Sequence, residues 1–141
     1  MRIFISHANK DRDLARTLAS QLVQAGFDVW NPEEEIGPGD NWARKIGQAL
    51  DECDLMIALV TRGSLELDSL RRDIEYALTS QNYERRLIPV LVDHVTFEAG
   101  KDVPWILLKM DPVYVPSRGA DFAEVVNRVQ AMAERDLHAA T

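Results

Sequence analysis

The sequence is poor in cysteine and contains no long apolar run. Cys53 is the only cysteine in 141 residues, so no disulfide can form within the chain. One thiol and three scattered histidines also lack metal-ligand spacing, and we expect no metal site. The longest apolar runs, such as Leu55–Val60, fall far short of the roughly 20 residues that cross a bilayer. The N-terminus has no basic stretch followed by an apolar segment, so we expect a cytoplasmic protein with no membrane partner.

Clustered positive charge is scarce as well. Sixteen Lys and Arg residues stand against 23 Asp and Glu residues, which gives a formal net charge of −7. The only arginine pairs are Arg71-Arg72 and Arg85-Arg86. Because a nucleic-acid surface needs clustered Lys and Arg, we expect no nucleic-acid partner.

The composition is that of one ordinary globular domain. Hydrophobic residues make up 46% of the chain and charged residues 28%, which excludes a disordered or fibrous protein. The length matches a single domain with a proper core. We expect this domain over residues 1–135, with residues 136–141 as a C-terminal tail or the start of a linker.

The hydrophobic pattern alternates between strands and helices. It predicts strands at residues 2–6, 27–30, 55–60, 87–92 and 113–115, and helices that begin near Asp13, Trp42, Leu70 and Phe122. Residues 31–40 contain two Pro and two Gly, which predicts an exposed loop. Three strands are continuous apolar runs, typical of strands buried on both faces. The pattern therefore predicts a five-stranded, doubly wound α/β domain with a parallel sheet and helices on both faces.

Ligands of such sheets bind beyond the carboxyl ends of the strands, here the loops after Ser6, Trp30, Val60 and Val92. A phosphoacceptor receiver domain would need acidic residues after the first strand and an aspartate ending the third. A dinucleotide fold of the Rossmann type would need glycines after the first strand. Neither pattern is present, because these places hold Ser6-His7 and Val60-Thr61, and residues 6–11 contain no glycine.

Four segments, in the right order on this alternation, resemble the Toll/interleukin-1 receptor (TIR) domain family, in its bacterial form. They are Phe4-Ile-Ser-His7 followed by Asp11, Glu35-Ile-Gly-Pro-Gly-Asp-Asn-Trp42, Arg71-Arg-Asp-Ile-Glu-Tyr-Ala-Leu78 and Ile88-Pro-Val-Leu-Val-Asp93. The resemblance covers residues 2 to about 132 and implies the flavodoxin-like fold.

The TIR family contains enzymes that cleave NAD and modules that only assemble signalling complexes. The resemblance implies an NAD hydrolase or cyclase that breaks the nicotinamide–ribose bond and releases nicotinamide and linear or cyclic ADP-ribose, acting in bacterial antiviral immunity. It implies NAD as substrate and no further cofactor. A non-catalytic assembly module is the alternative.

The resemblance also implies where the catalytic carboxylate stands. The family's pattern has a tryptophan four residues before the catalytic glutamate and an alanine four residues after it. Laid on Ile74 and Ala77, this pattern puts Asp73 at the glutamate and Ser69 at the tryptophan. Aspartate is one methylene shorter, and a catalytic group misplaced by about 1 Å costs on the order of 10²-fold in rate. The resemblance therefore implies an attenuated enzyme.

Glu75 is the alternative catalytic residue, because that register puts Ser69 at a family serine six residues before the glutamate. The apolar stripe of the helix centres near Ile74, and at about 100° per residue Asp73 and Glu75 lie on opposite flanks of it. They cannot share one role, and we favour Asp73. Either carboxylate could instead lie on a solvated flank and pair with Arg71 or Arg72.

The resemblance implies that NAD contacts the loops at the carboxyl edge of the sheet. The candidate binding residues are Ser6, His7, Asn9, Ile36, Gly37 and Trp42. Trp42 is in phase with Ile46 and Ala49, which favours core packing over a ligand contact. The Glu35–Trp42 loop, with its exposed apolar tip, is the expected contact to a second copy or to another TIR domain.

Overall fold

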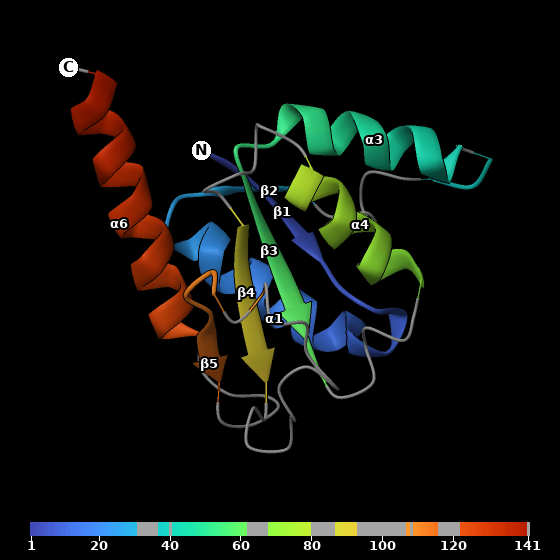
Figure 1. Ribbon diagram of the computed structural model, residues 1–141, viewed down its shortest axis with the longest axis horizontal. Helices are drawn as coiled ribbons and strands as arrows, with labels where there is room; N and C mark the ends of the chain where they lie inside the picture. Colours follow the sequence, from blue (N-terminus) through green and yellow to red (C-terminus); the bar gives the residue numbers. More distant parts are fainter. Residues whose placement is uncertain are drawn as a thin grey trace.

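Five parallel strands form the centre of the structure, in the order β2-β1-β3-β4-β5 (Figure 1). They are β1 (Arg2–Ser6), β2 (Asp28–Trp30), β3 (Leu55–Val60), β4 (Leu87–Val92) and β5 (Val113–Val115). All four neighbouring pairs are parallel. The predicted doubly wound sheet is therefore confirmed, and its strands end at one shared edge, the lower edge in Figure 1.

This computed structural model describes residues 1–30, 37–39, 41–61, 68–79, 87–92, 107, 109–115 and 122–140. Its helical elements are η1 (Asn9–Asp11), α1 (Arg12–Gln24), α3 (Trp42–Glu52), α4 (Asp68–Thr79) and α6 (Ala123–Ala140). All four predicted helices are present. The predicted third helix is α4, and α6 continues past residue 135.

Alternate residues of the strands pack against different helices. Ile3 and Ile5 of β1 share a core cluster with buried residues of α1 and α6. Phe4 lies in a second cluster with residues of α3 and α4 and stacks on Trp30 with ring centroids 5.2 Å apart. Because side chains alternate along a strand, the even-numbered positions of β1 face α3 and α4, and the odd-numbered ones face α1 and α6. The helices thus cover both faces of the sheet.

Strands β3 and β4 are buried at every residue, as expected for central strands covered on both faces. The helix ends are also stabilised by side chains. Asn41 precedes α3 and its Oδ1 accepts a hydrogen bond from the backbone amide of Arg44 at 3.1 Å. Gln21 of α1 accepts a hydrogen bond from the backbone amide of Phe122 at 3.0 Å, which ties the start of α6 to α1.

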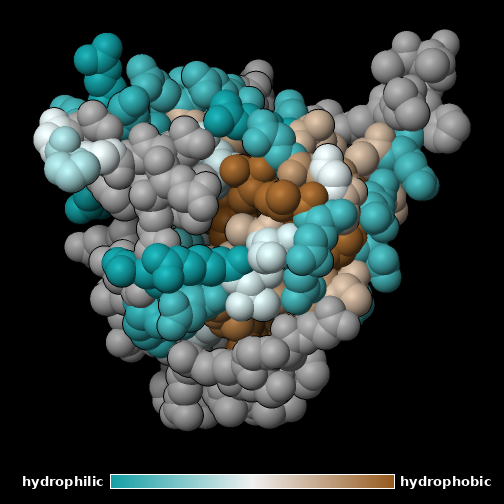
Figure 2. All heavy atoms as spheres, turned by 180° about the vertical axis from the view of Figure 1, so that it is seen from behind, coloured by the Kyte–Doolittle hydropathy of each residue, from teal (hydrophilic) through white to brown (hydrophobic). Residues whose placement is uncertain are grey.

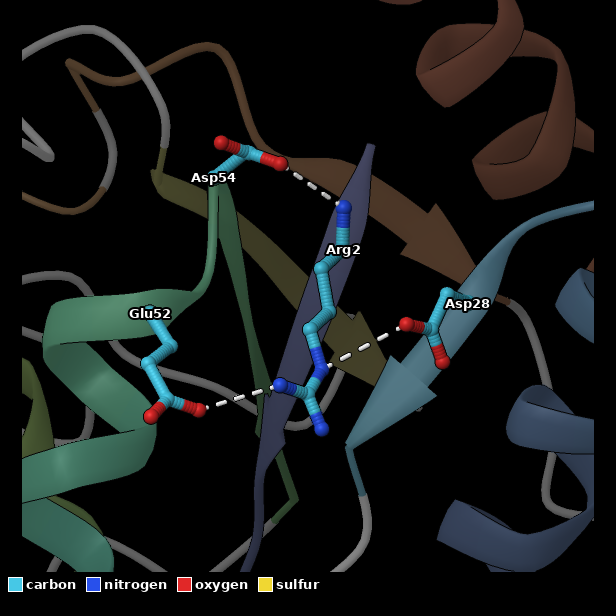
Figure 3. A network of polar contacts seen from close by, with 4 residues as sticks. All are labelled: Arg2, Asp28, Glu52 and Asp54. Atoms are coloured by element: carbon cyan, nitrogen blue, oxygen red, sulfur yellow. Dashed lines mark hydrogen bonds and ion pairs between the residues drawn. The ribbon is translucent and has the colours of Figure 1, made fainter.

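A network around Arg2 joins elements at the opposite edge of the sheet, where the strands begin (Figure 3). The Arg2 guanidinium contacts Glu52 at 3.0 Å and Asp28 at 3.4 Å. The backbone amide of Arg2 donates to the Asp54 carboxylate at 2.9 Å, and the Asp54 amide donates to the Arg2 carbonyl at 2.8 Å. One arginine of β1 is therefore linked to β2, to the end of α3 and to the start of β3.

The surface retains some apolar side chains. Figure 2 shows, from behind, an apolar area surrounded by hydrophilic side chains. Among the residues that the structure describes, the exposed large apolar side chains are Val23 and Tyr114, at 57% and 43%. Among the described helices, none is long and apolar enough to cross a membrane.

Candidate active site

Ser6 is the last residue of β1 and marks the carboxyl edge of the sheet. Strand alternation turns its side chain to the same face as Phe4, toward α4. The residue is 2% exposed, and its hydroxyl donates a hydrogen bond to Oδ2 of Asp73 at 2.8 Å. The structure thus brings together Ser6 and Asp73, two predicted site residues from distant parts of the sequence.

Asp73 lies on α4 next to the buried residues Leu70 and Ile74 and is itself half-buried. Burial raises the pKa of the Asp73 carboxyl from 3.8 to about 6, because a charged carboxylate loses hydration there, while the hydrogen bond from Ser6 lowers this pKa. A group with a pKa near 6 is mostly ionised at neutral pH. The arrangement therefore offers one partly desolvated carboxylate held by a hydroxyl, able to stabilise a nearby positive charge.

Glu75 lies on the opposite flank of the apolar stripe and is exposed, as are Arg71 and Arg72. The two candidate carboxylates thus occupy different environments, which agrees with the helical phase in the sequence. Asp73 is hydrogen-bonded to the end of β1. The catalytic role of either residue stays a prediction.

His7 follows Ser6 and is half-buried. Its Nδ1 lies 2.8 Å from the backbone carbonyl of Ala8. Because a carbonyl can only accept, Nδ1 carries the hydrogen, and Nε2 is the acceptor nitrogen of the neutral ring. Asn9 begins η1 in the same connection, and its side chain lies outside the described residues.

The predicted binding residues of the second loop are only partly described. Ile36 lies outside the described residues, whereas Gly37 is described and exposed. Trp42 is the first residue of α3, but its side chain is not described. The part these three residues take in binding stays a prediction.

Asp11 and Thr61 form a second carboxylate–hydroxyl pair at this edge, which the sequence analysis did not identify. Each is 2% exposed, and the Thr61 hydroxyl donates to Oδ2 of Asp11 at 2.6 Å. The signal in the sequence is alternation: Leu55, Ile57 and Leu59 face α1 and α6, and position 61 continues that series toward the start of α1.

Neither metal nor thiol chemistry is indicated by the described residues. They contain no group of three or more His, Cys, Asp or Glu side chains that could hold a metal ion. Burial raises the pKa of the Cys53 thiol from 9.0 to about 12, so the thiolate that would act as a nucleophile is scarce at neutral pH.

The sequence of this chain is similar to those of known proteins. A protein named 2' cyclic ADP-D-ribose synthase BtTIR, from Bacteroides thetaiotaomicron, is 39% identical over 59 residues, which cover 41% of this chain and 21% of that protein. The NAD(+) hydrolase PdTIR of Paracoccus denitrificans is 28% identical over 90 residues, or 62% of this chain and 30% of that protein. The chain spans less than half the length of these curated relatives.

A solved structure matches nearly the whole fold. The TIR domain of the Toll-related receptor TRR-2 from Hydra magnipapillata superposes with a TM-score of 0.63, over 96% of this chain and 94% of that domain. At 19% identity this likeness shows the fold alone. A family model described as TIR domain matches residues 3–126, most of the chain. The chain belongs to the TIR domain family.

Proposed function

We propose that the protein cleaves the nicotinamide–ribose bond of NAD and releases nicotinamide and an ADP-ribose product, linear or cyclised. The proposal rests on one observation above all: a half-buried carboxylate, Asp73, held by the buried hydroxyl of Ser6 where β1 ends. Relatives named 2' cyclic ADP-D-ribose synthase and NAD(+) hydrolase support the choice of substrate.

Asp73 would act by electrostatic stabilisation. As the bond to nicotinamide breaks, positive charge develops on the ribose in an oxocarbenium-like transition state. An ionised carboxylate stabilises that charge most strongly where water is partly excluded. Burial makes ionisation of Asp73 unfavourable before the reaction, and the developing cation offsets this cost in the transition state.

The other residues at this edge would hold NAD. In this proposal Ser6 orients Asp73 rather than contacting the substrate, because its hydroxyl already donates to the carboxylate. His7, with Nε2 as acceptor, and Asn9 face the dinucleotide from the connection between β1 and α1. Ile36, Gly37 and Trp42 contribute from the second loop. NAD is the substrate, and the reaction uses no further cofactor.

Self-association would complete the site. The Glu35–Trp42 loop is the contact through which copies of the domain meet, and assembly raises activity. Its described part, Gly37 to Gly39, is exposed, as a contact loop requires.

The decisive experiment measures nicotinamide release by chromatography at high protein concentration. Asp73→Asn should lower the rate by at least about 10²-fold, because it removes the charge that supports the transition state. Glu75→Gln is the matched control on the same helix and should retain wild-type activity. The reverse ranking would transfer the role to Glu75, and no NAD consumption by the wild type would favour an assembly module.

A companion variant tests the attenuation. Asp73→Glu restores the longer side chain and should raise the rate above that of the wild type, because the carboxylate then reaches one methylene further. A lower rate in this variant would show that the site is built for aspartate.

A further inference from the structure

Asp11 stands at the start of α1 but does not act as a helix cap. Asp is among the preferred residues at the position before a helix, because its carboxylate accepts hydrogen bonds from the first free amides. Asp11 makes no such side-chain hydrogen bond to α1. Its Oδ2 instead accepts the Thr61 hydroxyl at 2.6 Å. Residues that do not follow a strong local preference, such as this preference for capping, are expected at sites that serve a function.

The residue that bonds to Asp11 in place of the helix amides is Thr61, 50 positions away in the sequence. Thr61 directly follows β3, and both side chains of the pair are 2% exposed. A hydrogen bond to a charged group is shorter and stronger than one between neutral groups, and burial strengthens it further. The pair therefore fixes the first turn of α1 to the end of β3.

The two hydroxyl–carboxylate pairs are reciprocal. The end of β1 donates through Ser6 to Asp73 on α4, which follows β3. The end of β3 donates through Thr61 to Asp11, which follows β1. Ser6 lies in register with Ala58 of the neighbouring strand, so both donors belong to adjacent strand ends. Each strand end thus holds the segment that follows the other strand.

Between Ser6 and Asp11 the chain is folded on itself. The Ala8 carbonyl accepts the Asp11 amide at 2.9 Å and the His7 ring nitrogen at 2.8 Å, and Ala8 is fully buried. The Thr61 contact at Asp11 therefore restrains the whole His7–Asp11 connection. Ser6 is held separately by the sheet itself.

We propose that Asp11 and Thr61 are positioning residues for substrate binding: their pair holds the connection that carries His7 against the end of β3, beside the carboxylate of Asp73. This proposal rests on the proposed NAD-cleaving function and assigns the Asp11–Thr61 pair to the binding of NAD rather than to the chemical step. Loss of the pair would leave Asp73 bonded to Ser6 but would let the connection move, so NAD would bind less tightly while the chemical step changes little.

Thr61→Val removes the hydroxyl and keeps the shape of the side chain, and Thr61→Ser keeps the hydroxyl. In Thr61→Val we expect KM for NAD to rise by about tenfold, because only a fraction of molecules then has the connection in place. We expect kcat to change less than about threefold, since Asp73 is untouched. Thr61→Ser should restore both constants. Thr17→Val is the control, because Thr17 is exposed and its hydroxyl donates to the Asp13 carbonyl one turn earlier in the same helix.

Two measurements separate this proposal from the proposed function. Calorimetric titration of NAD into Asp73→Asn, with and without Thr61→Val, reports binding without chemistry. Amide hydrogen exchange of residues 8–11 needs no NAD at all and should be accelerated by Thr61→Val but not by Thr61→Ser or Thr17→Val. If the wild type neither cleaves nor binds NAD, the proposed function fails, and the exchange rates alone decide whether the Asp11–Thr61 pair restrains the connection.

Unchanged exchange and unchanged KM in folded Thr61→Val would overturn the positioning role. So would a Thr61→Ser protein as impaired as Thr61→Val, because the hydroxyl would then not be the cause. Thermal unfolding establishes that each variant is folded at the assay temperature. If Thr61→Val does not fold, Asp11→Asn, which removes the charge and keeps the side-chain shape, replaces it in the same measurements with the same expected direction.

Discussion

Asp73 is a residue whose ionisation opposes folding. Raising its pKa from 3.8 to about 6 corresponds to a penalty of about 3 kcal/mol for the charged form in the folded protein. Between these two pH values the folded state binds more protons than the unfolded state, so the contribution of Asp73 to stability falls as the pH rises through this window. Above pH 6 the whole penalty is present, and below 3.8 it vanishes.

Asp73→Asn should therefore stabilise the protein at pH 8 while it abolishes NAD cleavage. We expect the free energy of unfolding in urea to rise by about 1 to 3 kcal/mol at pH 8, and by much less near pH 4, where the wild-type carboxyl is protonated in the folded state. Glu75→Gln, at an exposed position, is the control and should change little at either pH. An equal gain at both pH values would contradict the assignment to ionisation.

Ser6 should tune the pH dependence of activity. The ionised form of Asp73 is the active one in the proposed reaction, so the rate falls as the pH drops through about 6. Because the Ser6 hydrogen bond lowers the pKa of Asp73, Ser6→Ala should shift this acid limb to higher pH. Ser20→Ala, on the exposed side of α1, is the matched control. A profile of kcat against pH that does not move would show that Ser6 has no influence on the active form.

The sequence pointed to candidate site residues but not to the contacts between them. The helical phase alone separated Asp73 from Glu75, because both lie on one helix with a clear apolar stripe. The Ser6–Asp73 contact joins residues 67 positions apart and depends on strand order, which local patterns do not encode. Asp11 shows the same limit: its position before α1 favours a helix cap, but its side chain makes no capping hydrogen bond.

At the scale of elements, strands and helices were predictable because their signals are local. Continuous apolar runs such as 55–60 and 87–92 can be buried only in a covered sheet, and the structure confirms both. Helix ends were less predictable. Helix α6 extends to Ala140, through residues that no longer carry a regular apolar pattern. Ends depend on caps and tertiary contacts more than on periodicity.

The edge of the sheet opposite the site depends on Arg2, which links three elements (Figure 3). Its partners Asp28 and Glu52 are 72% and 60% exposed, so each ion pair is screened by water and contributes at most about 1 kcal/mol. Arg2→Met should lower the free energy of unfolding by about 1 to 2 kcal/mol. Methionine keeps much of the apolar stem of arginine, so the lost free energy of unfolding measures the contribution of the charged group.

Arg16→Met is the matched control for this prediction. Arg16 pairs with Asp13 one turn away on α1 at 3.7 Å, with both side chains largely exposed, and such pairs contribute about 0.2 to 0.5 kcal/mol. Urea unfolding of both variants at low and high salt provides the comparison. Equal losses in the two variants would mean that Arg2 does not link the elements more strongly than an ordinary surface pair. Added salt should reduce the difference in free energy of unfolding between Arg2→Met and the wild type, because salt screens the ion pairs of Arg2.

At the scale of the whole molecule, the net charge of −7 opposes assembly. Copies of the chain repel one another at low salt, where charges act over longer distances. At 0.1 M salt this range shrinks to about 10 Å, and at 1 M to about 3 Å. A contact based on an apolar side chain gains from this screening, because burial of apolar surface does not depend on charge. Assembly through the Glu35–Trp42 loop should therefore strengthen as salt is added.

The last prediction joins assembly to activity. A contact between a loop of one copy and a different surface of the next is head-to-tail and repeats into open strands rather than closing as a dimer. If such a contact completes the site, NAD turnover rises faster than linearly with protein concentration. Ile36→Asp should abolish both the rise and the large species in light scattering, because it replaces the apolar side chain of the expected contact with a charge. Val23→Asp, at an exposed apolar residue of α1, tests whether any added charge has this effect. Specific activity that is the same at every concentration, and the same in wild type and Ile36→Asp, would show that each copy works alone.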